Sequence, residues 1–140
     1  MKKVLGCLSM AALAVVLAAP ISAQSIAVRA NVPFDFIVSG HTRPAGDYEF
    51  GMLSQGGVLR VKSESGKASA VTSSLTDRDG GSRTAVLVEF HRYGNEYFLY
   101  KVWNGGANLG REIPASRMEK EVVSRASVSR PETVMVLARL

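Results

Sequence analysis

Short segments in which apolar and polar residues alternate recur between residues 25 and 103, and turns that contain glycine separate them. Successive side chains in a strand point to opposite faces of a sheet, so this period of two is typical of strands with one buried face. The pattern predicts antiparallel β structure. The clearest alternating apolar positions are Ile26, Val28, Ala30 and Val32 in one segment and Tyr48, Phe50 and Met52 in another.

Turn residues divide this region into successive strands. Pro33 has no N–H donor, so residues 34–38 are expected to form a kinked continuation of the first strand or a new edge strand. Pro44-Ala45-Gly46-Asp47 has the composition of a tight turn. The other predicted features are a turn at residues 55–57, a hairpin that pairs residues 58–62 with residues 68–73, and a polar loop at residues 77–83.

Residues 84–93 and 96–103 form the clearest hairpin, joined by Gly94-Asn95. A two-residue connection of this composition suits the turns that match the twist of paired strands, and it fixes the register. The predicted partners are Tyr93 with Glu96, Arg92 with Tyr97, His91 with Phe98, Phe90 with Leu99, Glu89 with Tyr100 and Val86 with Trp103.

Alternation then divides the hairpin into two faces. The face assigned to the core holds Val86, Val88, Phe90, Tyr97, Leu99 and Trp103, with Arg92 and Lys101. The second face holds Leu87, Tyr93, Phe98, Tyr100 and Val102, with Glu89, His91 and Glu96. A face with this many apolar residues is not expected to be exposed to solvent. Either another element covers this second face or the face binds a ligand.

One helix is predicted after Pro114, where Ser116 and Glu119 have the spacing of a capping box. Its apolar stripe is expected to comprise Met118, Val122 and Ala126, and it covers the sheet. Residues 134–137 are apolar at every position and predict a closing strand that is buried on both sides. The predicted fold is therefore a single antiparallel β-sandwich or small β-barrel of about seven or eight strands, with one helix before the last strand.

The first 23 residues have the composition of a cleaved signal peptide. Lys2 and Lys3 precede an apolar run at residues 4–19, and Ser22-Ala23 provides a small-residue cleavage site. The run contains Gly6 and is shorter than the roughly 20 residues that span a membrane, so no transmembrane segment is expected after cleavage. The protein is predicted to be exported, periplasmic or extracellular, with residues 24–140 forming one domain.

Composition excludes several classes of function. Cys7 is the only cysteine and leaves with the signal peptide, so the domain has neither a disulfide nor a thiol nucleophile. The basic residues are spread along the chain, which argues against nucleic acid. His41 and His91 are the only histidines, so a metal site is not expected. No phosphate-binding or dinucleotide-binding loop is complete, and no cofactor is expected.

The candidate chemistry lies on the second face of the hairpin. Glu89, His91, Tyr93 and Tyr100 share that face, where a carboxylate can orient an imidazole for acid–base catalysis. The alternative is a polar stripe without catalytic function. The aromatic residues Tyr93, Phe98 and Tyr100 can instead stack on sugar rings or pack beneath another element. The candidate ligand-binding residues are Glu89, His91, Tyr93, Phe98 and Tyr100.

Two blocks of the sequence stand out. The first comprises Asn31-Val32-Pro33-Phe34-Asp35-Phe36 and Arg43-Pro44-Ala45-Gly46-Asp47-Tyr48; the second comprises Arg92-Tyr93-Gly94, Tyr97-Phe98-Leu99, Val102-Trp103, Gly110-Arg111-Glu112, Pro114, Ser116 and Glu119. Together these blocks resemble a family of small exported bacterial proteins of uncharacterised function. Arg43 departs from the family pattern, which usually has an apolar residue there. The resemblance implies an exported β-rich domain and transfers no catalytic or binding residue.

The sequence thus favours an exported, non-catalytic binding or structural module. An envelope polysaccharide, a small apolar ligand and a protein partner are the alternatives for what it binds. A second hypothesis is a small hydrolase or isomerase that uses Glu89, His91 and Tyr100, which requires these side chains to converge in a pocket. A third is self-assembly through an exposed strand edge.

Overall fold

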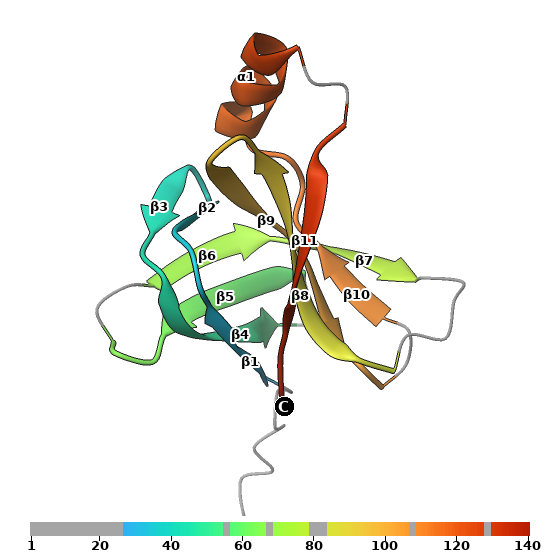
Figure 1. The fold of residues 1–140 in the computed structure, drawn as a ribbon. Helices are drawn as coiled ribbons and strands as arrows, with labels where there is room; N and C mark the ends of the chain where they lie inside the picture. Colours follow the sequence, from blue (N-terminus) through green and yellow to red (C-terminus); the bar gives the residue numbers. More distant parts are fainter. Residues whose placement is uncertain (1–26, 55–56, 67–68, 79–83, 107–108, 128–129) are drawn as a thin grey trace, which may run out of the picture.

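The computed structural model describes residues 27–54, 57–66, 69–78, 84–106, 109–127 and 130–140 (Figure 1). The predicted signal peptide, parts of the predicted turns at residues 55–57 and 64–67, and most of the polar loop lie outside the described residues. The elements are β1 (Ala27–Val32), β2 (Phe36–Val38), β3 (His41–Arg43), β4 (Gly46–Ser54), β5 (Val58–Ser63), β6 (Ser69–Ser73), β7 (Leu75–Arg78), β8 (Val86–Tyr93), β9 (Glu96–Asn104), β10 (Leu109–Glu112), α1 (Arg117–Ala126) and β11 (Glu132–Leu137).

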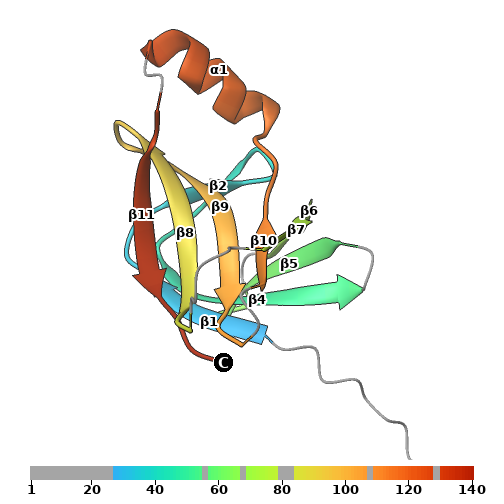
Figure 2. The ribbon, with the colours of Figure 1, turned by 90° about the vertical axis from the view of Figure 1, so that its right-hand side faces the viewer.

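The strands form two packed sheets. The first sheet has the order β1-β4-β5-β6, and the second has the order β11-β8-β9-β10-β7. The short β2–β3 hairpin joins the second sheet through a parallel contact of Ile37 with Phe98. Helix α1 lies at the end of the second sheet near the β8–β9 turn, as Figures 1 and 2 show. The predicted sandwich is confirmed, and the sheets do not close into a barrel.

Aromatic and branched side chains from both sheets fill the core. Phe36 is fully buried and makes edge contacts with Tyr48 and Phe90, at centroid distances of 4.9 and 5.4 Å. The hydroxyl of Tyr48 donates a 2.7 Å hydrogen bond to the carbonyl oxygen of Pro44, which satisfies the polar end of a buried ring. The alternation predicted for the first strand is confirmed at its described positions, since Val28, Ala30 and Val32 are buried.

Local pairing follows the predicted turns. β5 and β6 pair antiparallel, with Val58 opposite Ser73 and Lys62 opposite Ser69. β1 ends at Val32, directly before Pro33, as the missing N–H donor requires. Seven or eight strands were expected, whereas the described residues form eleven. The additional strands are short and are defined by their pairing rather than by an alternating sequence. For example, β10 pairs with β7, and β7 includes Asp77 of the predicted polar loop.

The register of the β8–β9 hairpin changes within the strands. The four predicted pairs nearest the turn are confirmed, from Tyr93 with Glu96 to Phe90 with Leu99. A β-bulge then makes Tyr100 an extra residue, so Glu89 pairs with Lys101 and Leu87 with Trp103. The predicted pairs of Glu89 with Tyr100 and of Val86 with Trp103 are therefore wrong.

Because a shift of one residue reverses the faces of a strand, the bulge exchanges the inner and outer residues beyond it. Val102 belongs to the core cluster, whereas Trp103 bonds to Glu89 on the opposite face. The assignment of Trp103 and Lys101 to the core face, and of Val102 to the second face, is wrong for this reason.

Helix α1 and strand β11 bury a different set of residues from the one predicted. Ser116 caps α1 by accepting a 3.2 Å hydrogen bond from the N–H of Glu119, as predicted. The helix buries Glu119 and Val122, whereas Met118 is exposed and Ala126 does not join the buried set. β11 is an edge strand rather than a doubly buried one, and its Leu137 is 82% exposed. No helix within the described ranges has the length and apolarity needed to cross a membrane.

Candidate functional site

The β-bulge collects polar and aromatic side chains on the outer face of the second sheet, which points away from the core. Glu89, His91 and Tyr93 reach this face from β8, and the bulge turns both Tyr100 and Lys101 of β9 toward it. A regular strand would place Tyr100 and Lys101 on opposite faces. These side chains form two groups, one beneath α1 and one beside β10.

Glu119 of α1 is the centre of the group beneath the helix. Its Oε1 lies 3.0 Å from His91 Nδ1 and accepts a 3.2 Å hydrogen bond from the hydroxyl of Tyr93. The ring of His91 stacks on Tyr100 with centroids 3.8 Å apart. Burial raises the pKa of Tyr93 to about 12, and the charge and hydrogen bond of Glu119 add to this effect because both favour the neutral phenol.

Lys101 and Glu89 are the buried charges of the group beside β10. The indole Nε1 of Trp103 donates a 3.0 Å hydrogen bond to Glu89 Oε1. Lys101 Nζ lies 3.5 Å from Glu112 Oε2, and it lies 4.9 Å from the ring centroid of Tyr100 and 5.1 Å from that of Trp103. Gly110 faces Trp103 across the strands, and a Cβ at that position would come within 2.9 Å of the indole.

The five predicted site residues all reach the outer face, but they do not form an open surface. Glu89, Tyr93 and Phe98 are buried, and His91 and Tyr100 are partly buried. Tyr93 and Phe98 pack with Val122 of α1, so their rings are not available as a flat platform for sugars. The carboxylate that contacts His91 is Glu119, not Glu89 as hypothesised.

Sequence reasoning missed Glu119, Lys101, Trp103 and Glu112 as members of these groups. The capping-box spacing predicts a capping role for Glu119, and its acidic side chain on the buried side of an amphipathic helix is the signal that points to the site. Lys101 and Trp103 have no such signal, because their orientation depends on the bulge. The hydrogen bonds of Glu119, His91 and Tyr93 connect α1 to β8, so this group positions the helix.

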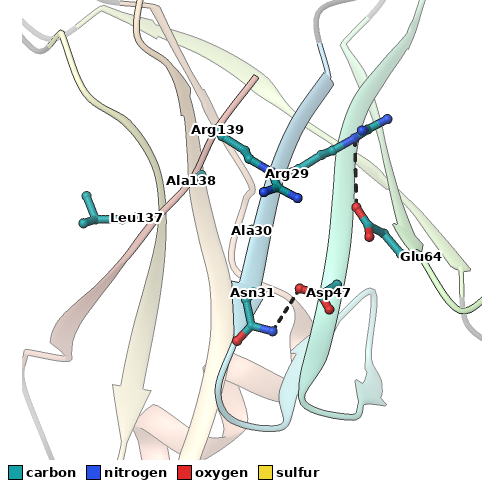
Figure 3. A pocket seen from close by; sticks show the side chains of 8 residues that line it. All are labelled: Arg29, Ala30, Asn31, Asp47, Glu64, Leu137, Ala138 and Arg139. Atoms are coloured by element: carbon teal, nitrogen blue, oxygen red, sulfur yellow. Dashed lines mark hydrogen bonds and ion pairs between the residues drawn. The ribbon is translucent and has the colours of Figure 1, made fainter.

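A different site lies where the two sheets meet at the C-terminal tail. Arg29 of β1 and Arg139 exchange backbone hydrogen bonds of 2.7 and 2.9 Å, which form an isolated antiparallel bridge. The next pair in this register would be Asn31 with Leu137, but the strands diverge there. The gap is a cavity of about 280 Å³, which we call the seam cavity, lined by Arg29, Ala30, Asn31, Asp47, Glu64, Leu137, Ala138 and Arg139 (Figure 3).

The backbone of β11 is open along this seam. Ala138 N–H donates to the carbonyl oxygen of Val86, so the even-numbered residues of β11 direct their backbone groups to β8. The odd-numbered residues direct theirs outward, as Arg139 does when it pairs with Arg29. Within the described ranges, no hydrogen bond reaches the backbone groups of Thr133, Met135 and Leu137. These groups form an unpaired strand edge.

The side chains around the seam cavity are mostly paired with each other. Arg29 contacts Glu49 at 3.2 Å and Glu64 at 4.0 Å, and Asn31 donates a 2.9 Å hydrogen bond to Asp47. The guanidinium of Arg139 has no hydrogen-bond or ion-pair partner in the described part of the chain. Figure 3 shows Leu137 pointing away from this polar group, toward solvent.

A second cavity of about 290 Å³ lies under the C-terminal half of α1. It is lined by Tyr93, Gly94, Glu96, Val122, Arg125 and Ala126. Neither this cavity nor the seam cavity is lined by Glu89, His91 or Tyr100. Among the residues with described positions, no group of three or more histidine, cysteine, aspartate or glutamate side chains is arranged to hold a metal ion.

Comparisons of the chain with protein-family models, with curated proteins and with solved structures give no match.

Proposed function

We propose that this protein is an exported, non-catalytic module that binds a protein partner by adding an extended strand to the β11 edge. The observation that supports this most directly is the row of unpaired backbone groups at Thr133, Met135 and Leu137, in line with the paired Arg139. An exposed sheet edge with this geometry accepts a further strand through main-chain hydrogen bonds, and side chains set the specificity.

The composition of β11 supports strand addition. Natural edge strands are usually protected by charges, prolines or bulges, but residues 133–138 contain no charged residue and no proline. Met135 and Leu137 are 55% and 82% exposed, so an added strand gains apolar contact as well as hydrogen bonds.

The other ligand classes receive less support from the geometry. Tyr93 and Phe98, two of the three aromatic residues that would stack on an envelope polysaccharide, pack against Val122 of α1. The two cavities, of about 280 and 290 Å³, are slightly smaller than the roughly 300 Å³ at which small-ligand sites begin. An acid–base enzyme needs its reactive groups to face a substrate, whereas Glu119 and Glu89 use a carboxylate oxygen to bind Tyr93 and Trp103.

A short peptide of alternating threonine and valine, with a glutamate at each end, tests strand addition. Two isomers with N-methyl groups on alternate residues serve as matched controls. We expect one isomer to bind like the parent peptide and the other to bind at least tenfold more weakly, because only one set of amides faces β11. In NMR titrations the largest amide shifts should be those of Thr133, Met135 and Leu137. Equal binding of both isomers, or no binding of the parent peptide, contradicts the proposal.

Export is tested independently of binding. The protein isolated from the source cells should begin at Gln24, because the signal peptide is expected to be cleaved after Ala23. N-terminal sequencing of the protein from the periplasmic and extracellular fractions measures this. A full-length chain that begins at Met1 in the cytoplasmic fraction contradicts export.

A further inference from the structure

We propose that the strand added to β11 is β11 of a second copy of this chain, paired antiparallel around a two-fold axis at Met135. This inference rests on the proposed function, because it names the partner of the same edge. It follows from four properties of the strand: the position of its open backbone groups, the face on which its apolar side chains lie, the absence of charge between its ends, and the charges at the two ends.

The open backbone groups are self-complementary. Around a two-fold axis at Met135, this residue pairs with its own copy, and Thr133 pairs with Leu137 of the other strand. All of these residues are odd-numbered, so each one directs its backbone N–H and C=O outward, away from β8. Each pair can therefore exchange two hydrogen bonds, and no bond to β8 is lost.

The apolar side chains fall on one face of the joined sheet. Val134 and Val136 pack against the core, so Met135 and Leu137 project on the outer face. Pairing of odd-numbered residues with each other keeps the faces of the two copies aligned. The Met135 side chains of the two copies then lie opposite each other at the axis, and the Leu137 side chains flank them, so surface that is exposed in one copy is covered in the pair.

The charges at the ends of the strand favour the antiparallel arrangement. Glu132, whose carboxylate lies 3.4 Å from Arg92, is at one end of β11, and Arg139, which has no side-chain partner within the described residues, lies beyond the other. Antiparallel pairing brings the acidic end of each strand beside the basic end of the other copy, whereas parallel pairing brings like charges together. Between these ends the strand has no charge to repel a second copy.

Analytical ultracentrifugation of the purified protein over a range of concentrations tests the inference. We expect a monomer–dimer equilibrium. Met135→Lys should weaken dimerisation at least tenfold, because it places two ammonium groups at the axis. Met118→Lys is the matched control, since Met118 is also exposed but lies on α1. This control should dimerise like the parent protein.

Hydrogen exchange shows whether the backbone forms the contact. In the dimer, the amides of Thr133, Met135 and Leu137 should exchange at least tenfold more slowly than in dilute protein, whereas that of Val136 should be protected in both. A protein that is monomeric at all concentrations, or a dimer that Met135→Lys leaves intact, overturns the inference. The proposed function is tested separately from dimerisation. Met135→Lys keeps the backbone N–H of residue 135, so the variant should still bind the threonine–valine peptide, and absence of this binding contradicts the proposed function.

Discussion

At the scale of single residues, the outer face of the second sheet differs from the core in that it buries charge. Glu89, Lys101 and Glu119 are each less than 8% exposed. Burial of an ionised group is costly unless hydrogen bonds and opposite charges compensate for it, and removal of one partner leaves the other uncompensated. The contacts of Glu119 with His91 and Tyr93 are thus coupled to the position of α1.

Substitution of Tyr93 should change how stability depends on pH. The pKa of Tyr93 rises from 10.0 to about 12 on folding, so the folded state favours the neutral phenol. The resulting stabilisation, about 3 kcal/mol, is fully present below pH 10 and is lost as the pH rises through 12. Tyr93→Phe should reduce this alkaline loss, and Tyr48, whose pKa is also raised by burial, accounts for a residual decrease.

Urea unfolding at a series of alkaline pH values measures the effect of Tyr93→Phe. At neutral pH the variant should lose about 1 kcal/mol, because the hydrogen bond to Glu119 is absent. Tyr97→Phe is the control at neutral pH, since the hydroxyl of Tyr97 forms no hydrogen bond within the described residues. An alkaline decrease in Tyr93→Phe as large as in the parent protein contradicts the assignment.

Two glycines with similar backbone conformations should differ in their tolerance of alanine. Gly57 has φ +81° and Gly66 has φ +72°, so an alanine at either position is strained by its Cβ, at a cost of about 1 kcal/mol. A Cβ at Gly57 would also lie 2.7 Å from the backbone oxygen of Ser74, whereas a Cβ at Gly66 would have no atom within 4 Å. We expect losses of about 3 kcal/mol for Gly57→Ala and about 1 kcal/mol for Gly66→Ala.

Chemical denaturation of the two glycine variants provides the comparison. Gly57 also accepts hydrogen bonds from the backbone N–H and the hydroxyl of Ser74, the residue that links β6 to β7, so movement of this carbonyl disturbs the connection between the sheets. Equal losses for the two variants would show that the close approach to Ser74 has no energetic effect.

At the scale of elements, the class of structure was predictable from sequence because alternation and turn composition are local. The Gly94-Asn95 connection fixed the four nearest pairs of the β8–β9 hairpin, and β8 itself is regular. Glu89, His91 and Tyr93 therefore reached the predicted face. The bulge at Tyr100 was not predictable, since the residues beyond it are apolar or amphipathic enough to suit either face.

The orientation of α1 and the position of β11 depend on tertiary contacts that periodicity does not contain. Met118 and Val122 fit one apolar stripe, but the helix docks through Glu119 because Tyr93 and His91 provide hydrogen-bonding groups beneath it. A run of apolar residues such as 134–137 is compatible with a central strand and with an edge strand. Its exposure was therefore not predictable from the sequence.

The alternating backbone direction of β11 should determine where proline is tolerated. Met135 directs its N–H outward, so in dilute, monomeric protein Met135→Pro removes no bond to β8 and should cost about 1 kcal/mol or less. Val136 directs its N–H to β8 and packs against the core, so Val136→Pro should cost about 3 kcal/mol or more. Thermal and urea unfolding of the two variants measure the difference. A larger loss for Met135→Pro than for Val136→Pro would reverse the assigned backbone directions.

At the scale of the whole molecule, the chain crosses between the two sheets from β1 to β2, from β3 to β4 and from β6 to β7. The last of these crossings passes through the buried Ser74. The backbone bridge of Arg29 with Arg139 joins β1 to the C-terminal tail at a further corner, without a covalent link. Its two hydrogen bonds close one end of the seam between β1 and β11.

Substitutions of Arg139 separate the contribution of its backbone from that of its side chain. Arg139→Pro removes the N–H that donates to Arg29 and should lower the free energy of unfolding by about 1 kcal/mol, whereas Arg139→Ala keeps this bond and should cost less than about 0.5 kcal/mol. The amide of Arg29, which donates to Arg139, should exchange faster with solvent in Arg139→Pro only. If both variants exchange alike at Arg29, the bridge does not hold the corner, and the seam is open in solution along the whole of β1.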